Sequence, residues 1–167
     1  FEKIWDYRKI LGGVMDPMTA FLTLRGLRTL ELRVRRHNQN AMMVAQFLDK
    51  QEKVRVVHYP GLPSHPDYDI ATKQMTGFGG VVSFWTRGAL KNVNRFLDSL
   101  ESIYIGPTLG GTETLITHPA TVTYYRNTRK ERYELGITDQ LCRLAVGVED
   151  PDDLIADLDK ALRKMLD

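Results

Sequence analysis

An arginine lies inside a short run of small and apolar residues near the end of the chain, and this position has the clearest potential for chemistry. Arg143 follows Cys142 and precedes Leu144, Ala145 and Val146, a composition typical of a β-strand. A guanidinium left without an anion in such surroundings carries a desolvation penalty on the order of several kcal/mol. Two interpretations are open. Arg143 faces water from the outer side of a strand, or its planar donor fork binds a carboxylate or phosphate.

A turn with two glycines is a second candidate for anion binding. Thr108 supplies a hydroxyl, and Leu109 begins the turn Leu109-Gly110-Gly111, whose backbone N–H groups could face an anion. A Gly-Gly pair is also among the commonest signals for an ordinary surface loop. The turn alone therefore does not decide between the two interpretations.

The remaining residue patterns give little support for other kinds of chemistry. The histidines show no helical pairing and no adjacent ligand cluster, so we expect no metal site at His37, His58, His65 or His118. The chain has no Gly-x-Ser-x-Gly motif, and Cys142 has no obvious base partner, so we expect no catalytic nucleophile. The glycines at 77–80 precede a strand instead of opening a helix, unlike a phosphate-binding loop.

The composition is that of an ordinary globular chain. Of 167 residues, 43% are hydrophobic and 26% are charged, and the formal net charge is +2. Acids and bases are interspersed without a basic face or tail, so we expect neither nucleic acid nor a membrane as a partner. The single cysteine favours a reducing compartment, the cytoplasm or a plastid stroma. The start at Phe1 favours a piece cut from a longer protein.

The elements that must position these residues follow from the apolar pattern. Asp16-Pro17 predicts a helix start, because Asp caps the first N–H groups and Pro at the next position loses no hydrogen bond. Helical spacing then predicts a long helix over residues 17–50, with bends near Gly26 and at His37–Asn40.

Short strands alternate with helices further along the chain. Strands are predicted at 54–59, 79–85 and 103–105 and around Arg143, and helices at 66–75, 89–100, 128–136 and from Pro151 to the end. This order predicts an α+β sandwich in which helices cover one face of a short-stranded sheet.

Six segments, taken in order, resemble one family. They are Leu11–Pro17, Leu24–Leu30, His58–Leu62, Gly79–Phe84, Thr108–Gly111 and Arg143–Asp150. Together they resemble the pyridoxal-phosphate-dependent enzymes of cysteine and methionine metabolism. That family includes cystathionine γ-synthase, cystathionine γ-lyase, methionine γ-lyase and the O-acetylhomoserine sulfhydrylases, and the resemblance runs along nearly all of the chain.

The resemblance implies the C-terminal portion of such an enzyme. The implied fold class is α/β, locally α+β. The end of the cofactor-domain connection is expected at 1–16, a long interdomain helix at 17–50 and the small C-terminal domain of a fold-type I enzyme at 51–167. In the family, the Schiff-base lysine and the main contacts to pyridoxal 5'-phosphate come earlier in the polypeptide. We therefore expect no catalytic or cofactor-binding residue in this chain, and no activity from the chain alone.

The resemblance also implies roles for individual residues. Arg143 matches the arginine that holds the substrate α-carboxylate, and Thr108, beside Leu109, matches a serine that helps at the same place. Thr123 matches a threonine near the active site, but Tyr124 stands where many members have histidine. Pro107 stands where several γ-lyases and synthases have glutamate, so the choice between synthase, lyase and sulfhydrylase stays open.

The implied function is substrate-carboxylate binding within an enzyme that eliminates or replaces a group at Cγ or Cβ of a sulfur amino acid or activated homoserine. The implied partners are a small amino-acid substrate, the remainder of the enzyme and identical subunits. The alternative is a free-standing, non-catalytic binding module derived from that domain.

Overall fold

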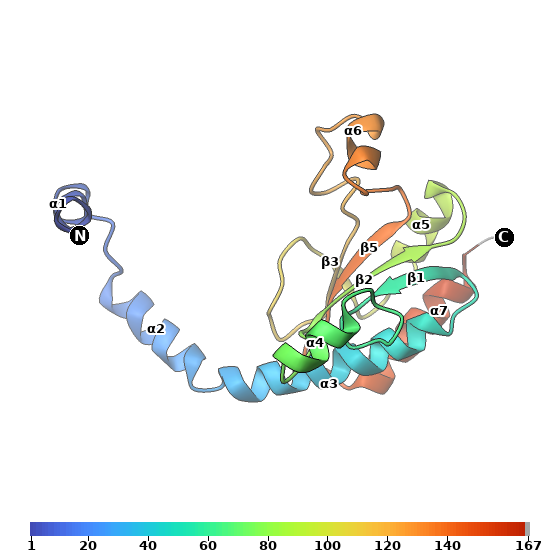
Figure 1. Cartoon of the computed structure of the whole chain (residues 1–167), viewed down its shortest axis with the longest axis horizontal. Coiled ribbons are helices and arrows are strands. Elements are labelled where there is room, and N and C mark those ends of the chain that lie inside the picture. The colour runs from blue at the N-terminus through green and yellow to red at the C-terminus, as the bar shows by residue number, and fades with distance from the viewer. Residues whose placement is uncertain (166–167) are drawn as a thin grey trace. The chain divides into compact units, whose positions relative to one another are not determined.

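The chain forms two compact units, residues 1–32 and the residues from 33 onward, and the computed structural model describes residues 1–165 (Figure 1). The first unit contains α1 (Glu2–Leu11), α2 (Pro17–Leu27) and the first residues of α3 (Leu30–Asp49). The second unit contains the rest of α3 and all later elements. In chain order these are β1 (Val54–His58), α4 (Tyr68–Gln74), β2 (Val81–Thr86), α5 (Leu90–Leu97), β3 (Tyr104–Ile105), β4 (Leu115–Thr117), α6 (Arg129–Glu134), β5 (Leu141–Ala145) and α7 (Pro151–Arg163).

The first unit consists of helices without buried side chains. Neither α1 nor α2 contains a buried residue. The cap of α2 is as predicted, because the Asp16 carboxylate accepts hydrogen bonds from the backbone N–H groups of Met18 at 2.9 Å and Thr19 at 3.0 Å. The sequence did not predict α1, which begins after Phe1 without a side-chain cap.

The helix predicted over residues 17–50 is two helices. α2 ends at Leu27 and α3 begins at Leu30, so the interruption predicted near Gly26 is confirmed. The bend predicted at His37–Asn40 is wrong, because α3 continues through these residues. Their polar side chains bind neighbouring loops: Asn38 Oδ1 accepts from the backbone N–H of Gly79 at 2.6 Å, and Asn40 Nδ2 donates to the Gly147 carbonyl at 3.1 Å.

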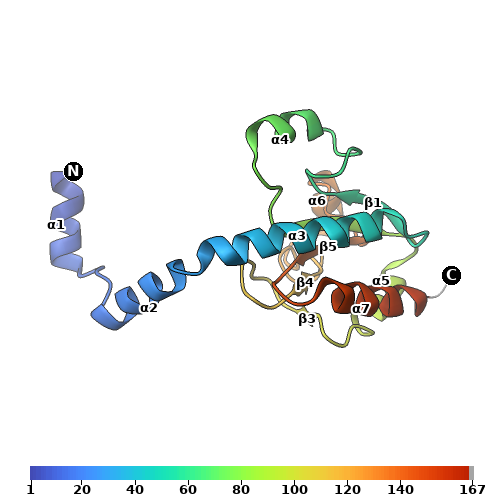
Figure 2. The same ribbon diagram turned by 90° about the horizontal axis from the view of Figure 1, so that it is seen from below.

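The second unit is built on a five-stranded sheet with the strand order β1-β2-β5-β4-β3. All neighbours are antiparallel except β3 and β4, which are parallel. Figures 1 and 2 show α3 and α7 side by side along one face of this sheet. The predicted class, a short-stranded sheet with helices packed on one face, is confirmed.

Alternate strand residues fill the core between the sheet and these helices. Val82 and Phe84 of β2 and Cys142 and Leu144 of β5 are fully buried. The rings of Phe84 and Phe96 of α5 meet edge to face with centroids 6.1 Å apart, which places α5 on the same face. Cys142 is a fully buried core residue, and burial raises the pKa of its thiol to about 12.

The short helix α6 lies between β4 and β5 in the chain, within the predicted helix at 128–136, and begins with a capping box. The Thr128 backbone N–H donates to Glu131 Oε2 at 2.8 Å, and the Glu131 backbone N–H donates to Thr128 Oγ1 at 3.3 Å. Gly136 follows the helix with a φ of 77°, a left-handed conformation that glycine adopts at little cost.

Candidate functional site

Arg143 lies in the middle of β5 and belongs to the sheet face opposite the helices. Its neighbours Cys142 and Leu144 are buried in the core, and the pleat of the strand turns Arg143 the other way. Across the sheet, Arg143 pairs with Ser83 of β2 on one side and Thr117 of β4 on the other. The arginine is half-buried among these neighbours.

The guanidinium of Arg143 is held by uncharged oxygens. Its Nη2 donates to the Pro107 carbonyl at 2.5 Å and lies 3.5 Å from both the Thr108 carbonyl and Thr117 Oγ1. Its Nε is buried and has no hydrogen-bond partner within residues 1–165. Over the same range no carboxylate forms an ion pair with Arg143. Carbonyls orient a guanidinium without neutralising it, so the group keeps its capacity to bind an anion.

The loop from Gly106 to Thr114 contains Thr108 and Leu109 and brings the Thr108 carbonyl to this face of the sheet. Thr108 approaches Arg143 through its carbonyl, whereas the sequence pointed to its hydroxyl. Leu109 has 56% of its surface exposed. Gly110 has a φ of 77°, so the turn that the Gly-Gly pair predicted needs glycine at this position.

Thr123 is exposed in the irregular segment after β4. Its backbone N–H donates to the Pro119 carbonyl at 3.1 Å. In the part of the chain that the structure describes, Arg143 forms hydrogen bonds with Pro107, Thr108 and Thr117 and none with Thr123.

Two groups at the site were not found from the sequence, the Pro107 carbonyl and the Thr117 hydroxyl. Thr117 is 26 residues from Arg143 in the chain and meets it only through the pairing of β4 with β5. The residues of either strand, taken alone, do not predict the register in which β4 pairs with β5. The sequence does not show which backbone carbonyl will face a side chain, and it marks Pro107 only as a departure from the family pattern.

A buried network holds the segment that follows Thr117. His118 Nδ1 lies 2.8 Å from Thr121 Oγ1, and His118 Nε2 lies 2.9 Å from the Asp139 carbonyl. Burial lowers the pKa of His118, an effect that outweighs the nearby Asp139. The Asp139 carboxylate in turn accepts from Arg132 at 2.8 Å and pairs with Arg129 at 3.1 Å. His118 therefore has a structural role.

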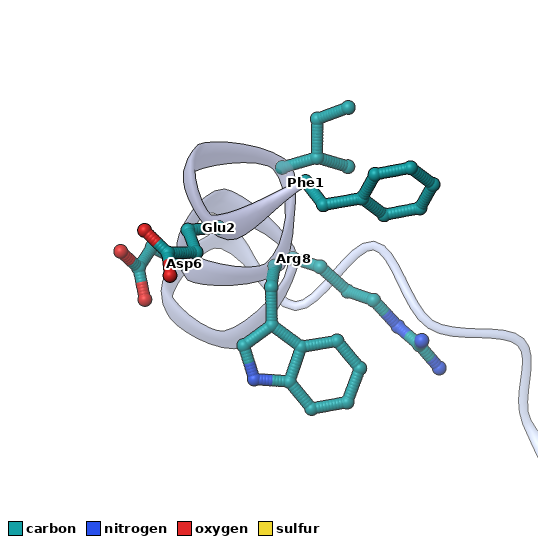
Figure 3. Close-up of a pocket in the computed structure, with 6 residues that line it drawn as sticks. Phe1, Glu2, Asp6 and Arg8 are labelled. Atoms are coloured by element: carbon teal, nitrogen blue, oxygen red, sulfur yellow. The ribbon is translucent and has the colours of Figure 1, made fainter.

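The remaining features of residues 1–165 do not form a binding or metal site. A hollow of about 740 Å³ lies beside α1. Figure 3 shows that Phe1 and Arg8 project to one side of this helix and Glu2 and Asp6 to the other. All lining residues of the hollow come from that one stretch of chain, so it has no opposing wall. Within residues 1–165, no group of three or more His, Cys, Asp or Glu residues is arranged to hold a metal ion. No helix in the same range has the length and hydropathy needed to cross a bilayer.

Comparison with known proteins identifies the context of this geometry. Residues 2–163 match the family described as Cys/Met metabolism PLP-dependent enzymes. The chain belongs to this family. It is 47% identical over 161 residues to the chloroplastic cystathionine gamma-synthase 1 of Nicotiana tabacum and 42% identical over 164 residues to the cystathionine gamma-lyase of Dictyostelium discoideum. The family cofactor is pyridoxal phosphate.

A solved structure of the family has the same fold. The crystal structure of a cystathionine gamma-lyase from Micromonospora echinospora superposes with a TM-score of 0.88 at 39% identity, over 95% of this chain and 41% of that one. The two curated relatives are covered over 30% and 42% of their lengths. The chain thus spans less than half of these family members.

The family cofactor forms a Schiff base with a lysine in enzymes of this type. Of the nine lysines here, eight are exposed, and half-buried Lys53 donates to the Met165 carbonyl. None contributes to the hydrogen bonds of Arg143. The residues that contact Arg143 therefore include no lysine among the described residues.

Proposed function

We propose that this chain is the substrate-carboxylate-binding portion of a pyridoxal-phosphate-dependent enzyme that eliminates or replaces a group at Cγ or Cβ of a sulfur amino acid or activated homoserine. Arg143 binds the α-carboxylate through its planar donor fork. Thr108, Leu109 and Thr123 line the approach to it. Cofactor, Schiff-base lysine and proton-transfer groups belong to the preceding part of the polypeptide.

The observation that carries this proposal is the state of the Arg143 guanidinium. It is half-buried, is oriented by the Pro107 carbonyl at 2.5 Å and has a buried Nε without a partner. A structural arginine in a sheet normally meets a carboxylate or projects into water. A guanidinium held by carbonyls and lacking an anion is already oriented for a ligand that brings one.

Binding of this kind assists the reaction by orientation. A two-point hold on the α-carboxylate fixes the rest of the amino acid relative to the cofactor, which supplies the electron sink when it is bound. The role of this chain's residues is to bind and align, and the proton transfers fall to residues outside it. On this proposal the isolated chain has no activity.

Several broader features of the proposal follow from the family. The division into a connection at 1–16, an interdomain helix at 17–50 and a small domain at 51–167 stays a prediction. We also propose association with the remainder of the enzyme and with identical subunits, in the cytoplasm or a plastid stroma. One of the relatives, the tobacco synthase, is described as chloroplastic.

A free-standing, non-catalytic binding module is the second candidate. The observation in its favour is that the residues from 33 onward form a unit with its own closed apolar core. Purifying the native polypeptide and determining its mass separates the candidates. A mass near 19.1 kDa supports the module, and a mass more than twice as large supports the enzyme.

The role of Arg143 is tested by Arg143→Ala in the complete polypeptide, with Arg55→Ala as the matched control. Both residues are strand arginines, but Arg55 is exposed on β1. We expect Arg143→Ala to raise KM steeply and to lower kcat/KM by about 2 to 5 kcal/mol in transition-state terms. Arg55→Ala should leave both parameters near wild type. An unchanged KM for Arg143→Ala would reject the role.

A further inference from the structure

The loop that faces Arg143 is fastened at both of its ends. This loop, residues 106–114, joins β3 to β4. At its near end the Gly106 backbone N–H donates to the Ile116 carbonyl at 2.9 Å, and the Thr117 hydroxyl donates to the Gly106 carbonyl. These bonds belong to the edge of the sheet. The far end of the loop, at residues 112–114, is held by a separate set of hydrogen bonds.

The Glu149 carboxylate and two backbone N–H groups hold the far end. The Thr114 backbone N–H donates to one oxygen of Glu149, and the Thr114 hydroxyl donates to the other oxygen at 2.8 Å. That hydroxyl also accepts from the Gly147 backbone N–H at 2.8 Å, and the Val148 backbone N–H donates to the Thr112 carbonyl at 2.9 Å. Thr114 is fully buried; its bond from Gly147 is buried, and its two bonds to Glu149 are part-buried.

Gly147 allows the two segments to approach this closely. A Cβ at this position would lie 2.2 Å from the Thr112 carbonyl oxygen and 2.3 Å from Glu149 Oε2. Both distances are far below van der Waals contact, and the first involves backbone that cannot rotate away. Any side chain at 147 would push the loop off Glu149.

The segment carrying Glu149 is itself fixed to the core. Asn40 of α3, which is fully buried, donates to the Glu149 carbonyl at 2.8 Å and to the Gly147 carbonyl at 3.1 Å. Arg36 Nη2 donates to the same Glu149 carbonyl at 3.3 Å. A continuous set of hydrogen bonds therefore runs from α3 through Glu149 and Thr114 to the loop that orients Arg143.

We propose that Glu149 is a positioning residue for Arg143, an inference that rests on the proposed function of Arg143. Its two carboxylate oxygens each accept one hydrogen from Thr114, and this pair of bonds holds the loop at a distance where the Pro107 carbonyl meets Arg143 Nη2. An amide has one acceptor oxygen where the carboxylate has two, so Gln in place of Glu cannot accept the two Thr114 hydrogens on separate oxygens. The far attachment is then weakened, because only the bonds from the Gly147 and Val148 backbone N–H groups are unchanged, and the guanidinium loses its fixed orientation.

The test uses the 167-residue chain labelled with ¹⁵N, in the absence of ligand. Solution NMR follows the Arg143 Nε–Hε resonance, and hydrogen exchange follows the Thr114 backbone N–H. The variants are Glu149→Gln, Thr114→Val, which lacks the hydroxyl, and Thr114→Ser, which keeps it. The matched control is Asp157→Asn. Asp157 is another carboxylate that holds a loop, accepting from the backbone N–H groups of Glu101, Ser102 and Ile103.

We expect Glu149→Gln and Thr114→Val to accelerate exchange at Thr114 by about tenfold or more and to shift or broaden the Arg143 resonance. Thr114→Ser should restore both signals, and Asp157→Asn should leave the Arg143 resonance in place. Faster loop exchange with an unchanged Arg143 resonance would overturn the proposal, and so would no change in either signal. Should Glu149→Gln fail to fold, Thr114→Val and Thr114→Ser test the hydroxyl that donates to Glu149, and an unchanged Arg143 resonance in Thr114→Val would overturn the proposal.

A second arm separates this inference from the proposed function. In the complete polypeptide, Glu149→Gln should raise KM for the amino-acid substrate by a larger factor than it lowers kcat. If Arg143→Ala leaves KM unchanged while Glu149→Gln still shifts the Arg143 resonance, the proposed function fails and the positioning contact stands. If Arg143→Ala raises KM and Glu149→Gln leaves both KM and the resonance unchanged, the positioning role alone fails.

Discussion

The two faces of the sheet are made by the same strands and serve different purposes. α3 and α7 cover one face of the sheet (Figure 2), α5 packs on the same face through Phe96, and strand residues such as Phe84 and Leu144 are fully buried there. On the opposite face, Ser83 and Arg143 are only half-buried, and Thr117 places a hydroxyl beside the guanidinium. Alternation along a strand thus separates the groups that pack in the core from the groups that we propose bind the substrate carboxylate. A substitution should affect stability or binding according to the face it lies on.

The largest effect on stability is expected on the covered face. Phe84→Ala removes a fully buried ring that meets Phe96, and we expect it to lower the free energy of unfolding by about 3 to 5 kcal/mol. Chemical denaturation of the 167-residue chain measures the change. A loss below 1 kcal/mol would mean that this face is not a packed core.

The second-largest effect on stability is expected for the ion pairs of Asp139 with Arg132 and Arg129, which depend on pH. Burial by itself raises the pKa of Asp139, but hydrogen bonding from Arg132 and the charges of Arg132 and Arg129 outweigh it, so the pKa lies below its ordinary value. A carboxylate with a lowered pKa stabilises the folded state above the unfolded pKa of about 3.9, and this stability is lost as pH falls through the folded pKa. Asp139→Asn should therefore cost about 1 to 3 kcal/mol at pH 7 and weaken the acid dependence below pH 4.

Denaturation curves between pH 2.5 and 7 check this expectation. Asp98→Asn, which changes an exposed carboxylate at the end of α5, is the control and should leave the curve near that of wild type. An Asp139→Asn variant as stable as wild type at pH 7 would show that the pair with Arg132 contributes nothing to the fold.

Arg143, on the opposite face, is expected to contribute little to stability. Arg143→Met removes a charge whose Nε lacks a partner and keeps a chain of similar length, so we expect a change within about 1 kcal/mol, with a gain as well as a loss allowed. The same denaturation assay compares it with Phe84→Ala. A loss as large as that of Phe84→Ala would break the distinction between the faces.

The smallest effect is expected in the first unit. Trp5 has 63% of its surface exposed, and α1 contains no buried residue. Trp5→Ala should therefore change the unfolding free energy of this chain by less than about 0.5 kcal/mol. A larger loss would show that the ring is packed in solution.

Much of the fold could be predicted from the sequence because its signals are local. Asp16-Pro17 marks a helix start, Thr128 and Glu131 form a capping box, and alternating burial marks the strands. The prediction of a bend at 37–40 failed because the polar side chains there form hydrogen bonds with loops that are distant in the sequence. Asn40 binds carbonyls more than 100 residues later, and no local pattern reports such a contact.

The candidate site was predictable only in part, for the same reason. An arginine among apolar strand residues is visible in the sequence, so Arg143 could be named. Thr117 meets Arg143 through the register of β4 with β5, and Pro107 meets it through a loop carbonyl. No sequence motif predicts either contact. Glu149 was visible as part of a family segment, but its bond to Thr114, 35 residues away, is a tertiary feature.

The most direct measurement of the central claim compares an amino-acid ligand with the corresponding amine, which lacks the α-carboxylate. Both are titrated against the complete wild-type polypeptide and its Arg143→Ala variant. If Arg143 binds the carboxylate, wild type prefers the amino acid by a factor corresponding to about 2 to 5 kcal/mol, and the variant loses that preference while binding the amine as before. A preference for the amino acid that survives in Arg143→Ala would contradict the account.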